Sequence, residues 1–405
     1  MEVVPRKRRP YSTLEKLEMK KTLVAFAALA SVSAFAQSTV TITGVADAGY
    51  QTGSEFGQSA KAVTQNGSRT SALKFVGVED LGGGLKAKFQ IGTDPSITAN
   101  NGNNFNSATT TGTNGTNVVA NGTAQTRGQS SAQSGLVGAE QNYVGVEGPF
   151  GEVQFGTINT NTLNAFNNAS QKFGTAIGSG YKKNIYGDYT RYENSWLYST
   201  PTVNGLSARY QSAVGNSSQY ALASSSVVLR RPTITEFGAN YDQGPLSVKA
   251  AMITSKATMN ETAATANIVT KIQTASVAYD FGVAKVSAGM QNITDNTATT
   301  PLNTKTSNMA VVVPVGAFNL MANTGTYNYN AGSLAATLGA GAKSTITGIG
   351  AHYNLSKNSY LYLMNESQSL GGYDMSTAVI NGAAGSNTTS SRSRKLTATG
   401  ISHAF

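Results

Sequence analysis

This sequence alternates two-faced strand segments with connections that are short and long in strict turn. One opening strand, seven hairpins and one closing strand give sixteen predicted strands. An up-and-down barrel with short turns on one side of a membrane and long loops on the other produces this alternation, whereas a soluble sandwich does not sort its loops by length. The opening strand is predicted at 40–49, the hairpins at 71–92, 136–157, 195–212, 233–254, 270–292, 307–329 and 345–366, and the closing strand at about 394–405.

The hairpin at 71–92 shows the strand pattern most clearly. Leu73 and Phe75 share one face of its first arm, and Lys74 lies on the other face. A cation that faces lipid near the middle of a bilayer costs about 2–4 kcal/mol, so we expect cations of this parity to face a lumen. A barrel of about sixteen strands is too wide for side chains to fill and leaves an aqueous channel. The cations opposite an apolar face are Lys74, Lys86, Lys88, Arg209, Lys249 and Lys285.

The N-terminal segment predicts export. Lys20 and Lys21 precede an apolar run at 23–30 and a small-residue site, Ala34-Phe35-Ala36. We expect residues 1–36 to be a signal peptide with a non-native extension before Met19, and residues 37–405 to form the barrel; the alternative is an unusually long n-region. The chain contains no cysteine. A closed, hydrogen-bonded barrel would stabilise an exported chain without disulfides.

The charge balance does not favour nucleic acid as a partner. Residues 37–405 hold 23 Lys and Arg against 17 Asp and Glu, a net charge of +6, and the cations are dispersed. No later apolar run is long enough for a membrane helix, so any membrane-spanning part must consist of strands.

Enzymatic chemistry is not expected either. A hydrolase barrel needs a histidine paired with a nucleophile or carboxylate, and the chain has only His352 and His403. His352 lies beside a predicted turn and His403 is the third residue from the end, so both are interpreted as structural. No metal-ligand spacing is present, and no cofactor is expected.

Four stretches carry a resemblance to a known family: EDLGGGLKA at 79–87, NYVGVEGPFG at 142–151, YNLSK at 353–357 and GISHAF at 400–405. Through them the sequence resembles the trimeric general-diffusion porins of Gram-negative bacteria, of the beta-proteobacterial and neisserial type. The resemblance implies an all-β, sixteen-stranded antiparallel transmembrane barrel in the outer membrane, with short periplasmic turns and long extracellular loops. It also implies a third loop, here residues 158–193, folded into the pore.

The resemblance further implies partners: two more copies of the chain in a homotrimer, outer-membrane lipid, and the barrel-assembly machinery. That machinery would read Phe405, with His403 and Ile401 before it, as an assembly signal. The family's cationic wall is only partly present, because Ala72 and Leu197 stand where relatives often carry arginine.

We therefore expect a water-filled channel for passive diffusion of small hydrophilic solutes and ions, with a weak-to-moderate preference for anions. The alternative is a non-conducting surface barrel that acts as an adhesin or receptor through its long loops. Inward-pointing charges favour the channel. The pore-lining and constriction candidates are Lys74, Lys86, Lys88, Asp47, Glu152, Arg209, Lys172, Lys182, Lys183, Asp188, Arg191 and Glu193.

Overall fold

The computed structural model describes residues 39–55, 58–95, 97–98, 140–179, 190–214, 220–221, 228–229, 233–257, 268–296, 303–331, 343–370 and 393–405. The predicted signal peptide lies outside these ranges. So do three of the constriction candidates, Lys182, Lys183 and Asp188.

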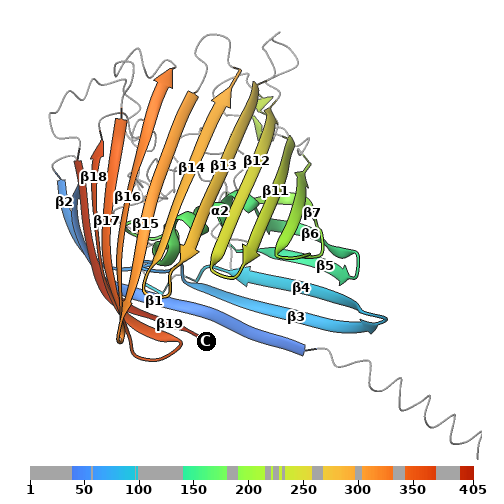
Figure 1. The fold of residues 1–405 in the computed structure, drawn as a ribbon, viewed down its shortest axis with the longest axis horizontal. Helices are drawn as coiled ribbons and strands as arrows, with labels where there is room; N and C mark the ends of the chain where they lie inside the picture. The colour runs from blue at the N-terminus through green and yellow to red at the C-terminus, as the bar shows by residue number, and fades with distance from the viewer. Residues whose placement is uncertain are drawn as a thin grey trace, which may run out of the picture.

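Sixteen strands form a closed antiparallel ring, as predicted (Figure 1). Neighbours in the chain pair with each other, and the last strand closes the ring by pairing with the first, from Val45 opposite Ala404 to Glu55 opposite Arg394. The ring consists of β1 (Thr39–Glu55), β3 (Ala72–Gly82), β4 (Leu85–Thr93), β5 (Asn142–Gly148), β6 (Gly151–Asn159), β7 (Arg191–Ser199), β8 (Leu206–Ala213), β11 (Thr233–Gln243), β12 (Leu246–Ala257), β13 (Ile268–Asp280), β14 (Lys285–Asp295), β15 (Asn303–Val315), β16 (Phe318–Ala331), β17 (Lys343–Asn354), β18 (Ser359–Leu370) and β19 (Ser393–Ala404).

The connections confirm the predicted alternation of short and long. β3 and β4 are joined at Gly83 and Gly84, whose φ angles of 63° and 80° suit glycine. Asp80 Oδ1 accepts a hydrogen bond from the backbone N–H of Gly82 at 2.8 Å, and Asp280 Oδ1 does the same for Gly282 at 2.8 Å in the β13–β14 turn. These local hydrogen bonds from backbone N–H groups to Asp side chains stabilise the two tight turns.

One strand was not expected. Residues 52–70 read as a polar loop, but β2 (Gln58–Gln65) turns back and pairs with the second half of β1, from Ala48 to Glu55. β3 pairs only with the first half of β1, Thr39 to Val45. β2 therefore supplies partners for backbone groups of β1 that β3 does not reach, and a bilayer leaves no water to do so. A separate two-stranded sheet, β9 (Tyr220–Ala221) with β10 (Val228–Leu229), lies outside the ring.

The strands have an apolar outer face and a mostly polar inner face. On β6 and β11 the outward Phe155 and Phe237 are 58% and 56% exposed, whereas Gln154 and Glu236 beside them are buried. The apolar outer face agrees with the two-faced strands that the sequence predicted. Among the described residues, no helix is both long enough and apolar enough to cross a membrane.

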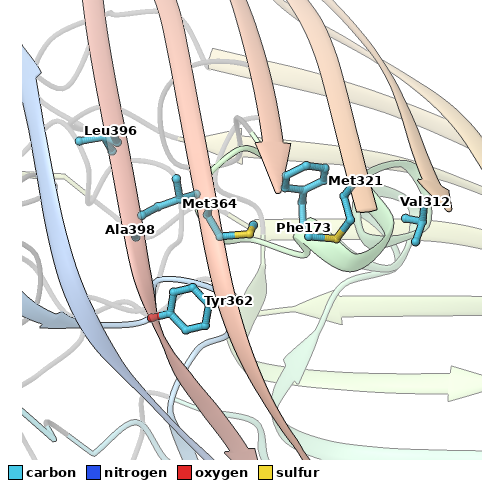
Figure 2. Packing of buried hydrophobic residues seen from close by; sticks show 8 residues of the cluster. Phe173, Val312, Met321, Tyr362, Met364, Leu396 and Ala398 are labelled. Carbon is cyan, nitrogen blue, oxygen red and sulfur yellow. The ribbon is translucent and has the colours of Figure 1, made fainter. Parts of the chain in front are cut away.

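The segment between β6 and β7 folds into the ring, as the resemblance implied, and it contains a helix that was not foreseen. Helix α2 (Asn161–Ser170) and the 3-10 turn η2 (Gln171–Phe173) lie inside the barrel (Figure 1). Thr160 caps α2, since its Oγ1 accepts from the Leu163 N–H at 3.1 Å. Phe173 packs against Val312, Met321 and other inward side chains of the wall (Figure 2). We refer to residues 160–179 as the inward segment.

Candidate functional site

The inward segment leaves two cavities in the lumen. The first, of about 860 Å³, has charged side chains contributed by the wall, by the segment after β2, and by the inward segment. The second, of about 710 Å³, lies between α2 and the wall of β12 to β16. Lys172 borders both. The charged residues of the first cavity are Arg69, Lys74, Asp94, Glu140, Lys172 and Arg191, and those of the second are Lys172, Lys249, Asp280 and Lys285.

A buried carboxylate holds the N-terminal end of the inward segment. Glu236 of β11 accepts hydrogen bonds from the backbone N–H groups of Asn161 at 2.7 Å and Thr162 at 2.9 Å, and from Thr162 Oγ1 at 2.9 Å. A negative charge is stabilised at a helix N-terminus, where backbone N–H groups lack helical partners. Gly238, the next inward position on β11, makes room for the Asn161 side chain, because a Cβ there would lie 2.6 Å from it.

A second carboxylate holds the C-terminal end. Glu366 of β18 accepts from the Gly178 N–H at 2.8 Å, and its other oxygen lies 3.3 Å from Arg394 Nη1 of β19. Asn323 of β16 donates to the Gly178 carbonyl at 2.8 Å. Gly348 of β17 faces Gly178 so closely that a Cβ would collide with its carbonyl oxygen. Both ends of the inward segment therefore rest on a carboxylate and a glycine of the wall.

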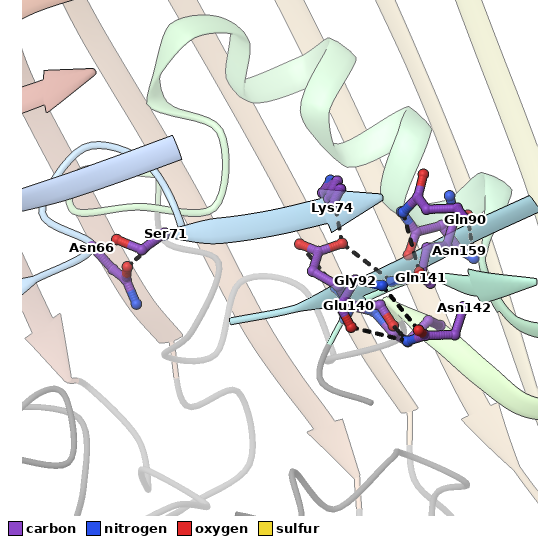
Figure 3. Close-up of polar contacts among 10 residues, drawn as sticks. Asn66, Ser71, Lys74, Gln90, Gly92, Glu140, Gln141, Asn142 and Asn159 are labelled. Carbon is purple, nitrogen blue, oxygen red and sulfur yellow. Dashed lines mark hydrogen bonds and ion pairs between the residues drawn. The ribbon is translucent and has the colours of Figure 1, made fainter. Parts of the chain in front are cut away.

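Two of the predicted cations meet at an acidic residue that the sequence analysis did not select. Lys74 Nζ lies 3.3 Å from Glu140 Oε2 (Figure 3). Arg191 Nη2 lies 3.9 Å from Glu140 Oε1. Asp94, which follows β4, lines the same cavity as Glu140. Burial and the neighbouring charge of Glu140 raise the pKa of Asp94 to about 7, against the opposing effects of Arg191 and Lys74.

The positive charge of Lys88 is neutralised more completely than those of Lys74 and Arg191. Its Nζ lies 2.9 Å from Glu147 Oε2 and 2.9 Å from Glu152 Oε1. Glu152 also accepts from the Gln154 amide at 2.9 Å. The predicted candidates Lys88 and Glu152 therefore neutralise each other on the wall, and neither lines the two cavities.

The other candidates lie at separate places. Arg209 of β8 donates to the Asn159 carbonyl at 3.1 Å, next to the start of the inward segment. Lys86 is exposed beside the β3–β4 turn. Glu193 is half-buried in β7 and lines neither cavity. Arg191 also lies in β7, which begins four residues before its predicted start.

Asp47 does not border the lumen, because its side chain is completely buried. Its carboxylate accepts from the N–H groups of Gly67 at 2.8 Å and Arg69 at 3.0 Å, and from the Tyr362 hydroxyl at 3.1 Å. Asp47 thus shapes the chain after β2 and presents Arg69, an exposed cation that the sequence analysis missed, to the first cavity.

The histidines and the C-terminus make structural contacts. Buried His352 shares a 2.9 Å hydrogen bond with Ser68 Oγ and stacks on Tyr360. His403 Nδ1 lies 2.8 Å from Ser359 Oγ. Phe405 exchanges two backbone hydrogen bonds with Gly44, at 2.9 and 3.1 Å, and its exposed ring lies on the same outer face as Ile401. In the part of the chain that the structure describes, no cluster of His, Cys, Asp or Glu is arranged to hold a metal ion.

A closed ring of sixteen strands with an apolar exterior, a charged lumen and a segment lying across that lumen defines a channel-forming outer-membrane barrel. The model of the Gram-negative porin family matches residues 22–395, and the chain belongs to that family. It is an outer-membrane porin channel of Gram-negative bacteria.

Relatives and solved structures agree with this assignment. The chain is 28% identical over 286 residues to outer membrane porin protein 32 of Delftia acidovorans, which covers 67% of this chain and 69% of the relative. It is similar in fold to the anion-selective porin from Comamonas acidovorans, at 22% identity and a TM-score of 0.66, covering 91% of this chain and all of that one. OmpF of Salmonella typhi, in complex with daunomycin, gives a TM-score of 0.62 at 14% identity, covering 90% and 97%.

Proposed function

We propose that this porin is a general diffusion channel for small hydrophilic solutes and ions, with a weak-to-moderate preference for anions. The observation that carries the proposal is the charge of the first cavity, where, among the side chains that the structure describes, the cations Arg69, Lys74, Lys172 and Arg191 outnumber the carboxylates Asp94 and Glu140. A constricted lumen with a low-dielectric wall focuses such a charge excess and raises the local anion concentration. The similarity in fold to an anion-selective porin also supports a preference for anions.

Charge compensation keeps the expected preference modest. Glu140 lies within ion-pair distance of both Lys74 and Arg191, so a passing anion meets a partly neutralised pair. The positions where relatives often carry arginine, Ala72 and Leu197, are buried and apolar. Arg69 and Lys172 are the two exposed cations of this cavity and contribute most to the proposed preference.

The test is the zero-current potential across a KCl gradient in planar bilayers. We expect wild type to pass chloride better than potassium at low salt, and the double variant Arg69→Gln and Lys172→Gln to lose most of that preference. Lys357→Gln is the matched control, because Lys357 is exposed in the β17–β18 turn and lines neither cavity. A cation-selective wild type, or a double variant with an unchanged potential, would contradict the proposal.

We further infer that the channel is a homotrimer in outer-membrane lipid and that the barrel-assembly machinery inserts it by reading its end, Phe405 with His403 and Ile401. The exposed outward placement of these three side chains supports their recognition by another protein. The mature chain is proposed to begin at Gln37, which N-terminal sequencing of outer-membrane material tests directly.

A further inference from the structure

We propose that Asp94 and Glu140 form a carboxyl pair that sets the ion preference of this channel and makes it depend on pH. The inference rests on the proposed diffusion function and names the residues that tune it. With one proton on the pair, anions are favoured more strongly. When that proton is lost, the preference weakens.

The two carboxyl groups meet because their strands pair. Asp94 follows β4 and Glu140 precedes β5, and β4 pairs with β5 from Lys86 opposite Glu147 to Gln90 opposite Tyr143. Both residues line the first cavity. The Glu140 side chain also packs against Gly92, two residues before Asp94, and two carboxyl groups held this close do not both ionise easily.

The surroundings locate that proton on Asp94. Glu140 is the partner of Lys74 and Arg191, at 3.3 and 3.9 Å, and its Oε2 also accepts from the Gln141 N–H at 3.2 Å. These three donors are directed at Glu140 and not at Asp94. By contrast, Asp94 Oδ1 is buried and has no hydrogen-bond partner in the described ranges, so an ionised Asp94 would leave a charged oxygen unsatisfied.

Charged groups face the pair from several elements in the described part of the chain. Lys74 faces it from β3, Arg191 from β7, Arg69 from the segment after β2, and Lys172 from the inward segment. His352 and the chain's terminal residue, Phe405, border the same cavity. The pKa of Asp94, raised to about 7 by burial and by Glu140, places the loss of its proton near neutral pH.

The charge of the constriction then changes by one unit. Loss of this proton near pH 7 adds one negative charge beside the four cationic side chains that the structure describes at the cavity. A unit charge a few ångströms from a permeating ion in a water-filled pore changes the entry of chloride and potassium in opposite directions. We expect the chloride-to-potassium permeability ratio to rise about two- to fivefold as pH falls from 9 to 5.

The experiment measures that ratio from zero-current potentials of the full channel at low salt between pH 5 and pH 9. Asp94→Asn should hold the high ratio at every pH. Glu140→Gln should shift the midpoint to lower pH, because it removes the neighbouring charge that raises the pKa of Asp94. Glu79→Gln is the control, since Glu79 is exposed near the β3–β4 turn and lines neither cavity, and it should keep the wild-type step.

A wild-type ratio that stays constant across this pH range would overturn the inference by itself, whether or not the variants assemble. An Asp94→Asn channel that keeps the step would overturn it as well. Conduction with a constant anion preference would defeat only this inference. A folded barrel that does not conduct, or that prefers cations at every pH, would defeat the proposed function.

Discussion

The hydrogen bonds that hold the inward segment to Glu236 lead to a quantitative prediction. Glu236 is buried and accepts three hydrogen bonds from Asn161 and Thr162 at the N-terminus of α2. In Glu236→Gln one of the two acceptor oxygens becomes an NH₂ group, which faces an N–H donor of the helix. The charge that favours this helix end is also lost.

The expected loss is about 2–4 kcal/mol, since a hydrogen bond to a charged group contributes roughly 1.5–3 kcal/mol and an unsatisfied buried donor costs about 1–3 kcal/mol. At about 1.4 kcal/mol per factor of ten, the equilibrium constant for the bound inward segment falls by about 30- to 700-fold. The Thr160 cap and the 2.8 Å hydrogen bond from Asn161 Nδ2 to the Ala250 carbonyl remain. We therefore expect the inward segment to detach from the barrel wall intermittently, while the barrel still folds.

Single-channel recording shows whether this happens. Glu236→Gln should conduct with larger and noisier open levels than wild type, while its folded barrel remains heat-modifiable on gels. Glu152→Gln is the matched control, because Glu152 also lies on the wall but pairs with Lys88 and does not touch the inward segment. A folded Glu236→Gln channel with wild-type conductance and noise would refute the proposed seating.

Three further predictions follow from the same contacts. Gly348→Ala should disturb the other end of the inward segment, because its methyl group collides with the Gly178 carbonyl, and channel noise should rise as in Glu236→Gln. Lys88→Gln should change the zero-current potential much less than Lys172→Gln, because Lys88 is held by two glutamates at 2.9 Å; an equal effect would contradict this. Deleting Phe405 should lower the amount of folded, heat-modifiable barrel in the outer membrane without changing the conductance of the channels that do form, and an undiminished amount would argue against an assembly role.

The barrel could be predicted from local pattern, because outward residues such as Phe155 and Phe237 alternate with polar residues along their strands. The elements that were missed lack such a pattern. Helix α2 is rich in asparagine, which has a low helix propensity, and its apolar positions Leu163 and Phe166 are few. β2 carries no clear alternation and exists because the edge of β1 needs a partner.

The start of β7 was missed for a different reason. Asn194 has a positive φ of 49°, and the β6–β7 register shifts between Gly156 and Ile158. These irregularities change which residues face inward, so Tyr192 and Ser195 are both buried although they are an odd number of positions apart. The alternation of inward and outward side chains cannot be extrapolated across such an irregularity in a strand.

The candidate site could be predicted only for residues whose inward position follows from the alternation of side chains along their strand. Lys74 could be assigned to the lumen from its strand alone, whereas Glu236 was not selected, although it lies next to the outward Phe237. That Glu140 pairs with Lys74 and Arg191, and that Asp94 reaches Glu140, depends on contacts between residues far apart in the chain. For Asp47 the alternation was misleading. It was predicted to line the pore, but its inward side chain is buried and has a structural role.

The central claim is that a charged constriction beside the inward segment selects weakly for anions, and one measurement tests it most directly. The zero-current potential of the wild-type channel is recorded across a fixed-ratio KCl gradient, first at low and then at high salt. We expect a potential of anion-selective sign at 0.1 M that declines toward zero at 1 M, where the Debye length shrinks from about 10 Å to about 3 Å. A cation-selective potential at 0.1 M, or an anion preference that does not weaken with salt, would contradict this account.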